Sequence, residues 1–357
     1  MPSFKTGLVV RMLQEREGLQ RVEVDLGSGP ERAYVLTQLT GSVAQGDEVV
    51  VNTTAVELGL GTGGWHVVHW NLRRGSWSEK GPGHIIKSRY TSLQSDVGSA
   101  EETYESLSEL ESIEGTPVIV AALHSQVPAV AVTVKELAPQ ARLVYIMTDG
   151  AGLPIAISDT VAQLQDRQLI DATITCGHAF GGDYEAVSIF SALAVARHIA
   201  NGDIVVVSMG PGIVGTNTRL GFSGMEVGPI LDAVESLEGV PIAALRISFA
   251  DERPRHFGLS HHSATALRIG SRGRALIPIP LVGEPEESQI RAELAEAGID
   301  QKHELVDVGA PDVLDLFSKN NMEVVSMGRP ASSDPVLFQS AAAAAALAVE
   351  YFKGNGE

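Results

Sequence analysis

The chain has 357 residues, more than a single domain usually holds, and 5% of them are aromatic. Its formal net charge of −18 at pH 7 creates a field that repels phosphate backbones and anionic lipid surfaces, so neither nucleic acid nor a membrane is an expected partner. The single cysteine, Cys176, excludes an internal disulfide and favours a reducing compartment, which predicts a cytoplasmic protein.

Two apolar stretches are candidates for an export signal or a membrane span. Residues 1–13 hold too short an apolar run for a signal peptide, so we expect no export. The longest apolar run, residues 340–349, is well short of the roughly 20 residues that span a bilayer. We therefore expect no membrane crossing.

Residues 1–72 predict a small β-rich domain. Short β-type runs are separated by glycine, asparagine and aspartate, and residues 21–26 alternate charged and apolar side chains like a half-buried antiparallel strand. The expected strands are residues 6–12, 20–25, 32–38, 47–52 and 65–71. Together they predict a barrel-like N-terminal domain.

Residues 73–115 differ in character and predict a connector. Glycine and proline turns are followed by an acidic stretch at residues 101–114 that includes a short helix. A solvated linker surface explains this composition better than an acidic binding tail.

Residues 116–357 predict a Rossmann-like α/β domain with a mainly parallel sheet and helices on both faces. Apolar runs of strand length alternate with helical segments, as is typical of strands buried on both faces. The expected strands are residues 117–123, 143–147, 172–175, 204–207, 242–247 and 275–279. The expected helices are residues 159–167, 184–200, 225–237, 261–269, 285–297 and 335–352, the last with Asp334 as N-cap.

Polar side chains follow the ends of these strands. Ligands of an open parallel sheet bind beyond the carboxyl ends of its strands, whereas the loops at the opposite edge of this sheet are bland. The candidate catalytic residues are His124, Asp149, His178, Asp251 and His262. We expect the first four to line one pocket with the loop at residues 210–224. The alternative is that each is a turn residue or a hydrogen-bonded structural histidine.

The loop at residues 210–224 matches G-x-G-x-x-G after a strand. It follows the fourth expected strand and lacks a P-loop lysine, so neither a dinucleotide fold nor a P-loop is indicated, and no cofactor is identified. Backbone N–H groups and polar side chains there suit a small anion. The predicted binding residues are Gly210, Gly212, Gly215, Thr216, Asn217 and Arg219. A long structural turn is the alternative.

His261 and His262 follow Ser260, which is the expected N-cap of a helix. The helix dipole disfavours imidazolium there, so we expect both rings to be neutral and to face the 210–224 loop. Neither H-E-x-x-H nor C-x-x-C is present, so no metal site is expected. Cys176 is expected to be a buried structural thiol, and Ser223 lacks the spacing of a nucleophile elbow.

Four motifs together resemble an uncharacterised bacterial protein family, a domain of unknown function. The likeness extends over essentially the whole chain, and it implies no activity and no residue roles. The motifs are Thr148-Asp149-Gly150-Ala151, residues Thr175 to Asp183, residues Met209 to Thr216, and Ser260-His261-His262.

Two classes of function remain open. The first is an enzyme acting on a small anionic, for example phosphorylated, metabolite, which the density of titratable groups favours. The second is a non-catalytic ligand-binding or regulatory protein, with the barrel as an interaction or homo-oligomer module. Titratable groups that converge would favour the enzyme, and scattered histidines would favour the binding protein.

Overall fold

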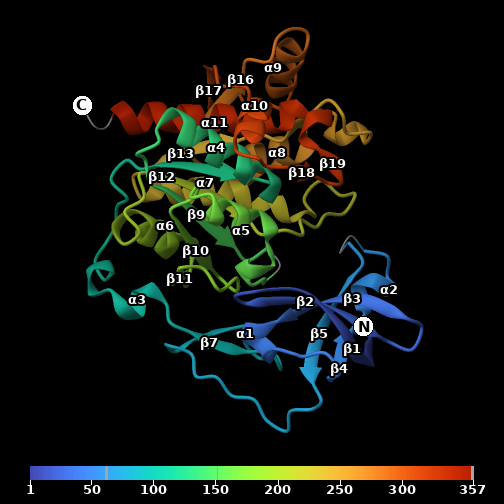
Figure 1. The fold of residues 1–357 in the computed structure, drawn as a ribbon. Coiled ribbons are helices and arrows are strands. Elements are labelled where there is room, and N and C mark those ends of the chain that lie inside the picture. Colours follow the sequence, from blue (N-terminus) through green and yellow to red (C-terminus); the bar gives the residue numbers. More distant parts are fainter. Residues whose placement is uncertain (61–62, 151, 355–357) are drawn as a thin grey trace.

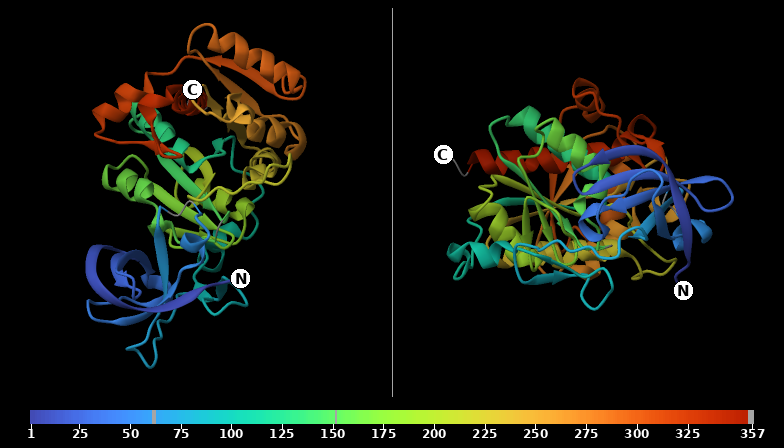
Figure 2. Two further views of the ribbon diagram at one scale, coloured as in Figure 1. Left: turned by 90° about the vertical axis from the view of Figure 1, so that its right-hand side faces the viewer. Right: turned by 60° about the horizontal axis from the view of Figure 1, so that its bottom comes forward.

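The computed structural model describes residues 1–60, 63–150 and 152–354. Figure 1 shows a small β-barrel next to a larger α/β unit, and the two views of Figure 2 place the barrel at one end of that unit. Ala151, part of one of the four motifs above, lies outside the described residues.

Five strands close the N-terminal barrel in the order β1-β2-β3-β5-β4. Neighbouring strands are antiparallel except β3 and β5, which pair in parallel. Alternate side chains such as Val22, Val24, Val49 and Val51 fill the interior and are almost fully buried. The elements are β1 (Phe4–Arg16), β2 (Leu19–Asp25), β3 (Pro30–Leu36), α1 (Thr37–Thr40), β4 (Glu48–Asn52), α2 (Thr54–Glu57) and β5 (Trp65–Asn71). The predicted barrel is confirmed.

The segment after the barrel is anchored to the α/β unit rather than being wholly a solvated linker. It contains β6 (Ile85–Lys87), β7 (Ser95–Val97), α3 (Ala100–Thr103) and the 3-10 turn η1 (Glu105–Leu107). Lys87 is 1% exposed, and its Nζ donates to the carbonyls of Gly177 (2.8 Å) and Ala179 (2.9 Å). The same Nζ lies 3.2 Å from the carboxylate of Glu185.

The α/β unit contains eight parallel strands in the order β11-β10-β9-β12-β8-β13-β16-β17. Every residue of β8, β9, β10, β12 and β16 is buried, because helices cover both faces of the sheet. The strands are β8 (Pro117–Ala121), β9 (Leu143–Thr148), β10 (Ala172–Cys176), β11 (Tyr184–Ala186), β12 (Ile204–Met209), β13 (Val240–Ala244), β16 (Leu276–Pro280) and β17 (Glu304–Val308). The predicted Rossmann-like fold class is confirmed.

Two layers of helices enclose the sheet. One layer consists of α4 (Val127–Leu137), α5 (Asp159–Asp166), α10 (Val313–Lys319) and α11 (Pro335–Gly354), whose apolar residues share one hydrophobic core. The other contains α6 (Ile189–His198), α7 (Val227–Ser236), α8 (His261–Thr265) and α9 (Glu286–Glu296). Small pieces complete the fold: the β14 (Ile247–Ser248) and β15 (Gly258–Leu259) pair, the β18 (Val325–Ser326) and β19 (Arg329–Pro330) pair, and the short turns η2 (His124–Gln126), η3 (Ile155–Ile157), η4 (Ser223–Glu226), η5 (Pro254–His256), η6 (Ala266–Gly270) and η7 (Ala331–Ser333).

The last helix, α11, is a core helix. It is long and apolar enough to cross a membrane by length and composition alone, but 67% of its most apolar window is buried inside the protein. Residues 341–346 are all alanine and at most 4% exposed, so that α4 and the sheet approach the helix closely. Asp334 immediately precedes α11, and its carboxylate accepts hydrogen bonds from Ser248 Oγ and Arg329 Nη2.

The expected helix at residues 184–200 begins with a strand. Residues 184–186 form β11, which extends the edge of the sheet beside β10, and α6 then begins after its N-cap Ser188. Asp183 holds the turn before β11, since its carboxylate accepts hydrogen bonds from the backbone N–H and the hydroxyl of Thr173. Helices α4 and α10 and strand β17 were not predicted.

The connections after β9 and β12 leave the sheet on opposite faces. Strand β9 leads to α5 in one helix layer, whereas its neighbour β12 leads to α7 in the other. In doubly wound sheets, ligands generally bind at the carboxyl ends of the strands beside such a reversal.

Candidate functional site

A buried carboxylate surrounded by arginines lies just beyond β14. Asp251 is 3% exposed and accepts hydrogen bonds from Arg253 Nη2 (2.7 Å) and Nε (2.8 Å). Its Oδ2 also lies 3.4 Å from Arg246 Nη2 and 3.7 Å from Arg329 Nη2. The hydrogen bonds from Arg253 hold the pKa of Asp251 well below its usual range. Asp251 is therefore a fixed negative charge that orients three guanidinium groups.

Arg246, which follows β13, is the most buried of these cations. Its side chain is 2% exposed, and its Nε has no hydrogen-bond partner. Burial, reinforced by the positive charge of Arg253, lowers the pKa of Arg246 to about 10, so it stays charged at neutral pH. A charged donor left unpaired in a buried place is costly and is common where a ligand binds.

Three histidines lie beside Arg246. One ring nitrogen from each of His256, His261 and His262 lies within 4.8 Å of the others. His256 Nδ1 is 2.7 Å from Ser260 Oγ, and His262 Nδ1 is 3.4 Å from Arg246 Nη1. Burial, followed by the charge of Arg246, lowers the pKa of His256 and of His262 to about 3, and burial also lowers the pKa of His261. All three rings are therefore neutral at pH 7.

The 210–224 loop faces these histidines, but as a small hairpin. Phe222 stacks on the ring of His262 with centroids 3.9 Å apart and planes 4° apart. The N–H of Thr216 donates to Gly221 (2.7 Å), and the N–H of Ser223 donates to Val214 (2.9 Å). These two amides are used within the loop and are not available to an anion.

The predicted binding residues of the loop have different surroundings. Gly210 is buried at its base, whereas Gly212, Gly215 and Arg219 are exposed. The loop is tied to the arginines through Arg255, whose Nη1 donates to Asn217 Oδ1 (2.7 Å) and lies 3.5 Å from the carbonyl of Thr216. The loop therefore contributes two features to the site: Asn217, which binds Arg255, and the ring of Phe222, which stacks on His262.

The other predicted catalytic residues do not join this cluster. His124 hydrogen-bonds through its two ring nitrogens to Ser158 Oγ (2.7 Å) and Tyr145 Oη (3.1 Å), and burial lowers its pKa to about 4. Asp149 accepts the backbone N–H of His178 (3.0 Å), and His178 Nδ1 accepts the N–H of Ser88 (3.0 Å). Of the five candidates, only Asp251 and His262 belong to this cluster, because both contact Arg246. Asp149 and His178 form a separate pair.

Sequence reasoning missed Glu226, at the end of η4. Its carboxylate accepts a hydrogen bond from Thr148 Oγ1 (2.7 Å), which places it beside the carboxyl end of β9. Burial, aided by the negative charge of Asp149, raises the pKa of Glu226 to about 7. The turn η4 also packs against α8. In the sequence Glu226 is one acidic residue at a helix start, and nothing distinguishes it.

Arg246 and Lys87 were also missed, although each carried a signal. Arg246 interrupts an apolar run of residues 242–247, and a charge within a buried strand usually has a partner or a function. Lys87 follows two isoleucines in a segment that was interpreted as a solvated linker. In both cases the charged residue directly follows apolar residues in the sequence.

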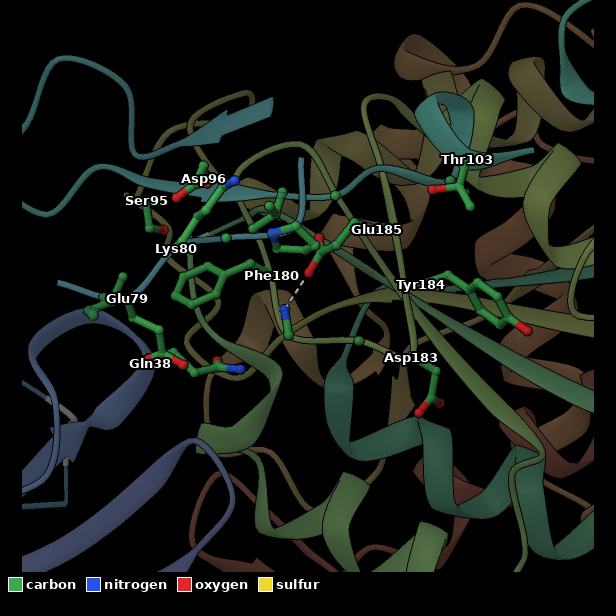
Figure 3. Close-up of a pocket in the computed structure, with 18 of the residues that line it drawn as sticks. Gln38, Glu79, Lys80, Ser95, Asp96, Thr103, Phe180, Asp183, Tyr184 and Glu185 are labelled. Carbon is green, nitrogen blue, oxygen red and sulfur yellow. Dashed lines mark hydrogen bonds between the residues drawn. The ribbon is translucent and has the colours of Figure 1, made fainter. Parts of the chain in front are cut away.

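A hollow of about 530 Å³ lies elsewhere, between the barrel, the segment after it and the turn from β10 to β11 (Figure 3). Four carboxylates line it against one lysine: Glu79, Asp96, Asp183 and Glu185, and Lys80. Figure 3 shows Glu185 bonded to the backbone N–H of Gly181, and the same carboxylate pairs with Lys87. The charge of this lining disfavours an anion in the hollow.

We name as the arginine–histidine site the residues Arg246, Asp251, Arg253, Arg255, His256, His261, His262 and Arg329. A family model described as "Protein of unknown function (DUF3866)" matches residues 32–345, which is most of the chain. No curated protein matches the sequence.

Proposed function

The chain therefore belongs to the DUF3866 family, and within this family of unknown function we propose that it is a cytoplasmic enzyme acting on a small anionic, phosphorylated metabolite. The substrate would bind at the arginine–histidine site. The observation that carries the proposal is the buried guanidinium of Arg246, which has an unpaired Nε and stands beside three neutral imidazoles.

Local charge supports an anionic ligand. Three arginines, Arg246, Arg253 and Arg329, pair with two carboxylates, Asp251 and Asp334, and a fourth, Arg255, bonds to Asn217 of the loop, so positive charge is in excess. The chain as a whole carries −18, so this excess runs against the global charge. A guanidinium matches the geometry of a phosphate oxygen pair better than an ammonium does.

Groups that could exchange protons support a reaction rather than binding alone. His261 Nε2 is buried without a hydrogen-bond partner, so its ring is not committed to a structural bond there. Glu226 has a pKa near 7 and lies on the turn that packs against α8. An acid whose pKa is near the working pH is efficient in proton transfer.

The proposal is tested by screening phosphorylated metabolites for turnover. Arg255→Gln should raise KM for an active compound, because it removes one charge-assisted contact, while His261→Ala should lower kcat. His84→Ala is the matched control, since the His84 side chain is exposed and pairs with Glu102 in the segment after the barrel. Binding of phosphorylated compounds without any turnover would support the alternative, a non-catalytic ligand-binding protein. Binding that Arg255→Gln and Arg253→Gln leave unchanged would refute the site.

A further inference from the structure

We propose that His256, His261 and His262 form a binding site for a divalent transition metal ion such as Zn²⁺. The inference rests on the same site as the proposed function, but it requires no bound anion. The motifs in the sequence indicated no metal site, because the spacing His-x4-His-His matches no familiar zinc motif. The fold brings the three rings together by joining the end of η5 to the start of α8 through the short strand β15.

The rings are close enough to share an ion. One nitrogen from each residue lies within 4.8 Å of the other two, whereas two ligands of a tetrahedral zinc ion lie about 3.3 Å apart. The rings would therefore move together by roughly 1 to 1.5 Å on binding, a change that side-chain rotation can supply. The ring centroids are 4.4 to 5.0 Å apart, so the rings are in contact with one another, and they would turn as well as shift to direct their nitrogens at one ion.

Hydrogen bonds leave lone pairs available on two of the rings. Ser260 Oγ accepts a hydrogen bond from the backbone N–H of His262 (3.3 Å) and lies 2.7 Å from His256 Nδ1. His256 can therefore donate from Nδ1 to this hydroxyl oxygen, which leaves the lone pair of His256 Nε2 available. Metal-bound histidines are commonly oriented by such a bond from the other ring nitrogen. His261 Nε2 is buried and has no hydrogen-bond partner, and coordination would satisfy it.

His262 provides the third ligand, and its ring is oriented by contact with Phe222. Its plane is fixed by stacking on Phe222, and its contact from Nδ1 to Arg246 Nη1 is 3.4 Å, too long for a strong hydrogen bond. Loss of that contact would cost little. The imidazole set, without thiolate, suits zinc, cobalt, nickel or copper better than magnesium or calcium.

The surrounding charge predicts how the metal would be used. Neighbouring arginines disfavour a cation, and the buried carboxylate of Asp251 offsets them only in part. A site with three protein ligands keeps a position open, which is typical of catalytic rather than structural zinc. An anion held by the arginines would then meet the metal at that open position.

The test is titration of the chelator-treated, full-length protein with Zn²⁺ alone, followed by calorimetry, and with Co²⁺, followed by visible absorption. We expect one ion per chain and an intense Co²⁺ spectrum of tetrahedral type. His261→Ala should weaken binding by at least about 100-fold, more than loss of an outer hydrogen bond does. Arg255→Gln should strengthen it, because it removes a nearby positive charge, and His84→Ala should leave it unchanged.

Three results would overturn the metal site: no saturable Zn²⁺ binding, binding that His261→Ala does not affect, or a Co²⁺ spectrum of octahedral type. The Co²⁺ spectrum of the unsubstituted protein decides the matter if His261→Ala fails to fold. Phosphate binding is measured separately on the metal-free protein. Phosphate binding without Zn²⁺ binding would refute the metal site and leave the proposed function standing, whereas Zn²⁺ binding without phosphate binding would do the opposite.

Discussion

Four charged side chains, three of them buried and that of Glu226 partly buried, lie near the ends of strands or short turns, and each has a different degree of pairing. Lys87 is paired with Glu185 and two carbonyls, Asp251 with three arginines, and Arg246 only in part. Glu226 accepts a hydrogen bond from one hydroxyl and forms no ion pair with the residues that the structure describes. Because the cost of a buried charge depends on its partners, these residues should respond differently to pH and to substitution.

Glu226 should make the protein less stable as pH rises. Its pKa is raised in the folded state to about 7 from 4.5, so the folded protein binds the proton more tightly than the unfolded chain does. The stability linked to this proton is present below the unfolded pKa and is lost as pH rises through the folded pKa. Glu226→Gln removes this loss. The unfolding free energy of the variant minus that of the unsubstituted protein should therefore increase by about 2 to 3 kcal/mol from pH 5 to pH 8.

Urea unfolding of both proteins across this pH range measures the effect. The difference between the two isolates Glu226, because the other groups titrate equally in both. Glu296→Gln, at an exposed position of α9, is the control and should show no such trend. A difference that does not change with pH would mean that Glu226 titrates normally.

At the scale of elements, the alanines of α11 set how closely the helix approaches α4 and the sheet. Ala344 is fully buried, and the packed interior leaves no room for a larger side chain. Ala344→Leu should therefore destabilise the protein by about 1 to 3 kcal/mol. Thermal or urea unfolding measures the loss, and Glu350→Leu, exposed on the same helix, should have little effect. Equal effects of the two substitutions would mean that α11 is loosely packed.

The ion pair of Lys87 connects β6 to the turn after β10 and to β11. Lys87→Met removes the cation that pairs with the buried carboxylate of Glu185 and the ammonium that donates to the carbonyls of Gly177 and Ala179. We expect a loss of roughly 3 to 5 kcal/mol in unfolding free energy. The double variant Lys87→Met/Glu185→Gln should recover part of this loss, because no unpaired charge remains. A loss below about 1 kcal/mol for the single variant would show that the pair is effectively solvated.

Most elements could be predicted where one pattern dominates. The barrel strands alternate, and the central strands of the large sheet are mostly apolar, so both types were recognised. Helix α4 was missed because its run of valine and alanine at residues 127–137 is as apolar as the strand before it. Strand β11 was missed because three residues at a sheet edge have no pattern of their own, and only pairing with β10 defines them.

At the scale of the whole molecule, the edge of the sheet that carries polar clusters could be predicted, but their convergence could not. Strand order places the carboxyl ends together, whereas each side chain turns to the nearest partner. His124 therefore bonds to Ser158, and His178 to the segment after the barrel. The cluster of arginines was not predicted, since its arrangement around Asp251 includes Arg329 from the distant β19.

The central claim is that the arginine–histidine site binds a small anion although the protein carries −18. The most direct measurement is the change in melting temperature on titration with inorganic phosphate, for the unsubstituted protein, Arg253→Gln, Arg255→Gln and Arg291→Gln. The last removes the same charge from α9, where Arg291 pairs with Asp307. Phosphate that binds the folded state should raise the melting temperature by a few degrees at concentrations about tenfold above Kd. The account predicts this rise in the unsubstituted protein and in Arg291→Gln, and a much smaller rise in the other two variants. An unchanged melting temperature in all four, or an equal rise in all four, would contradict it.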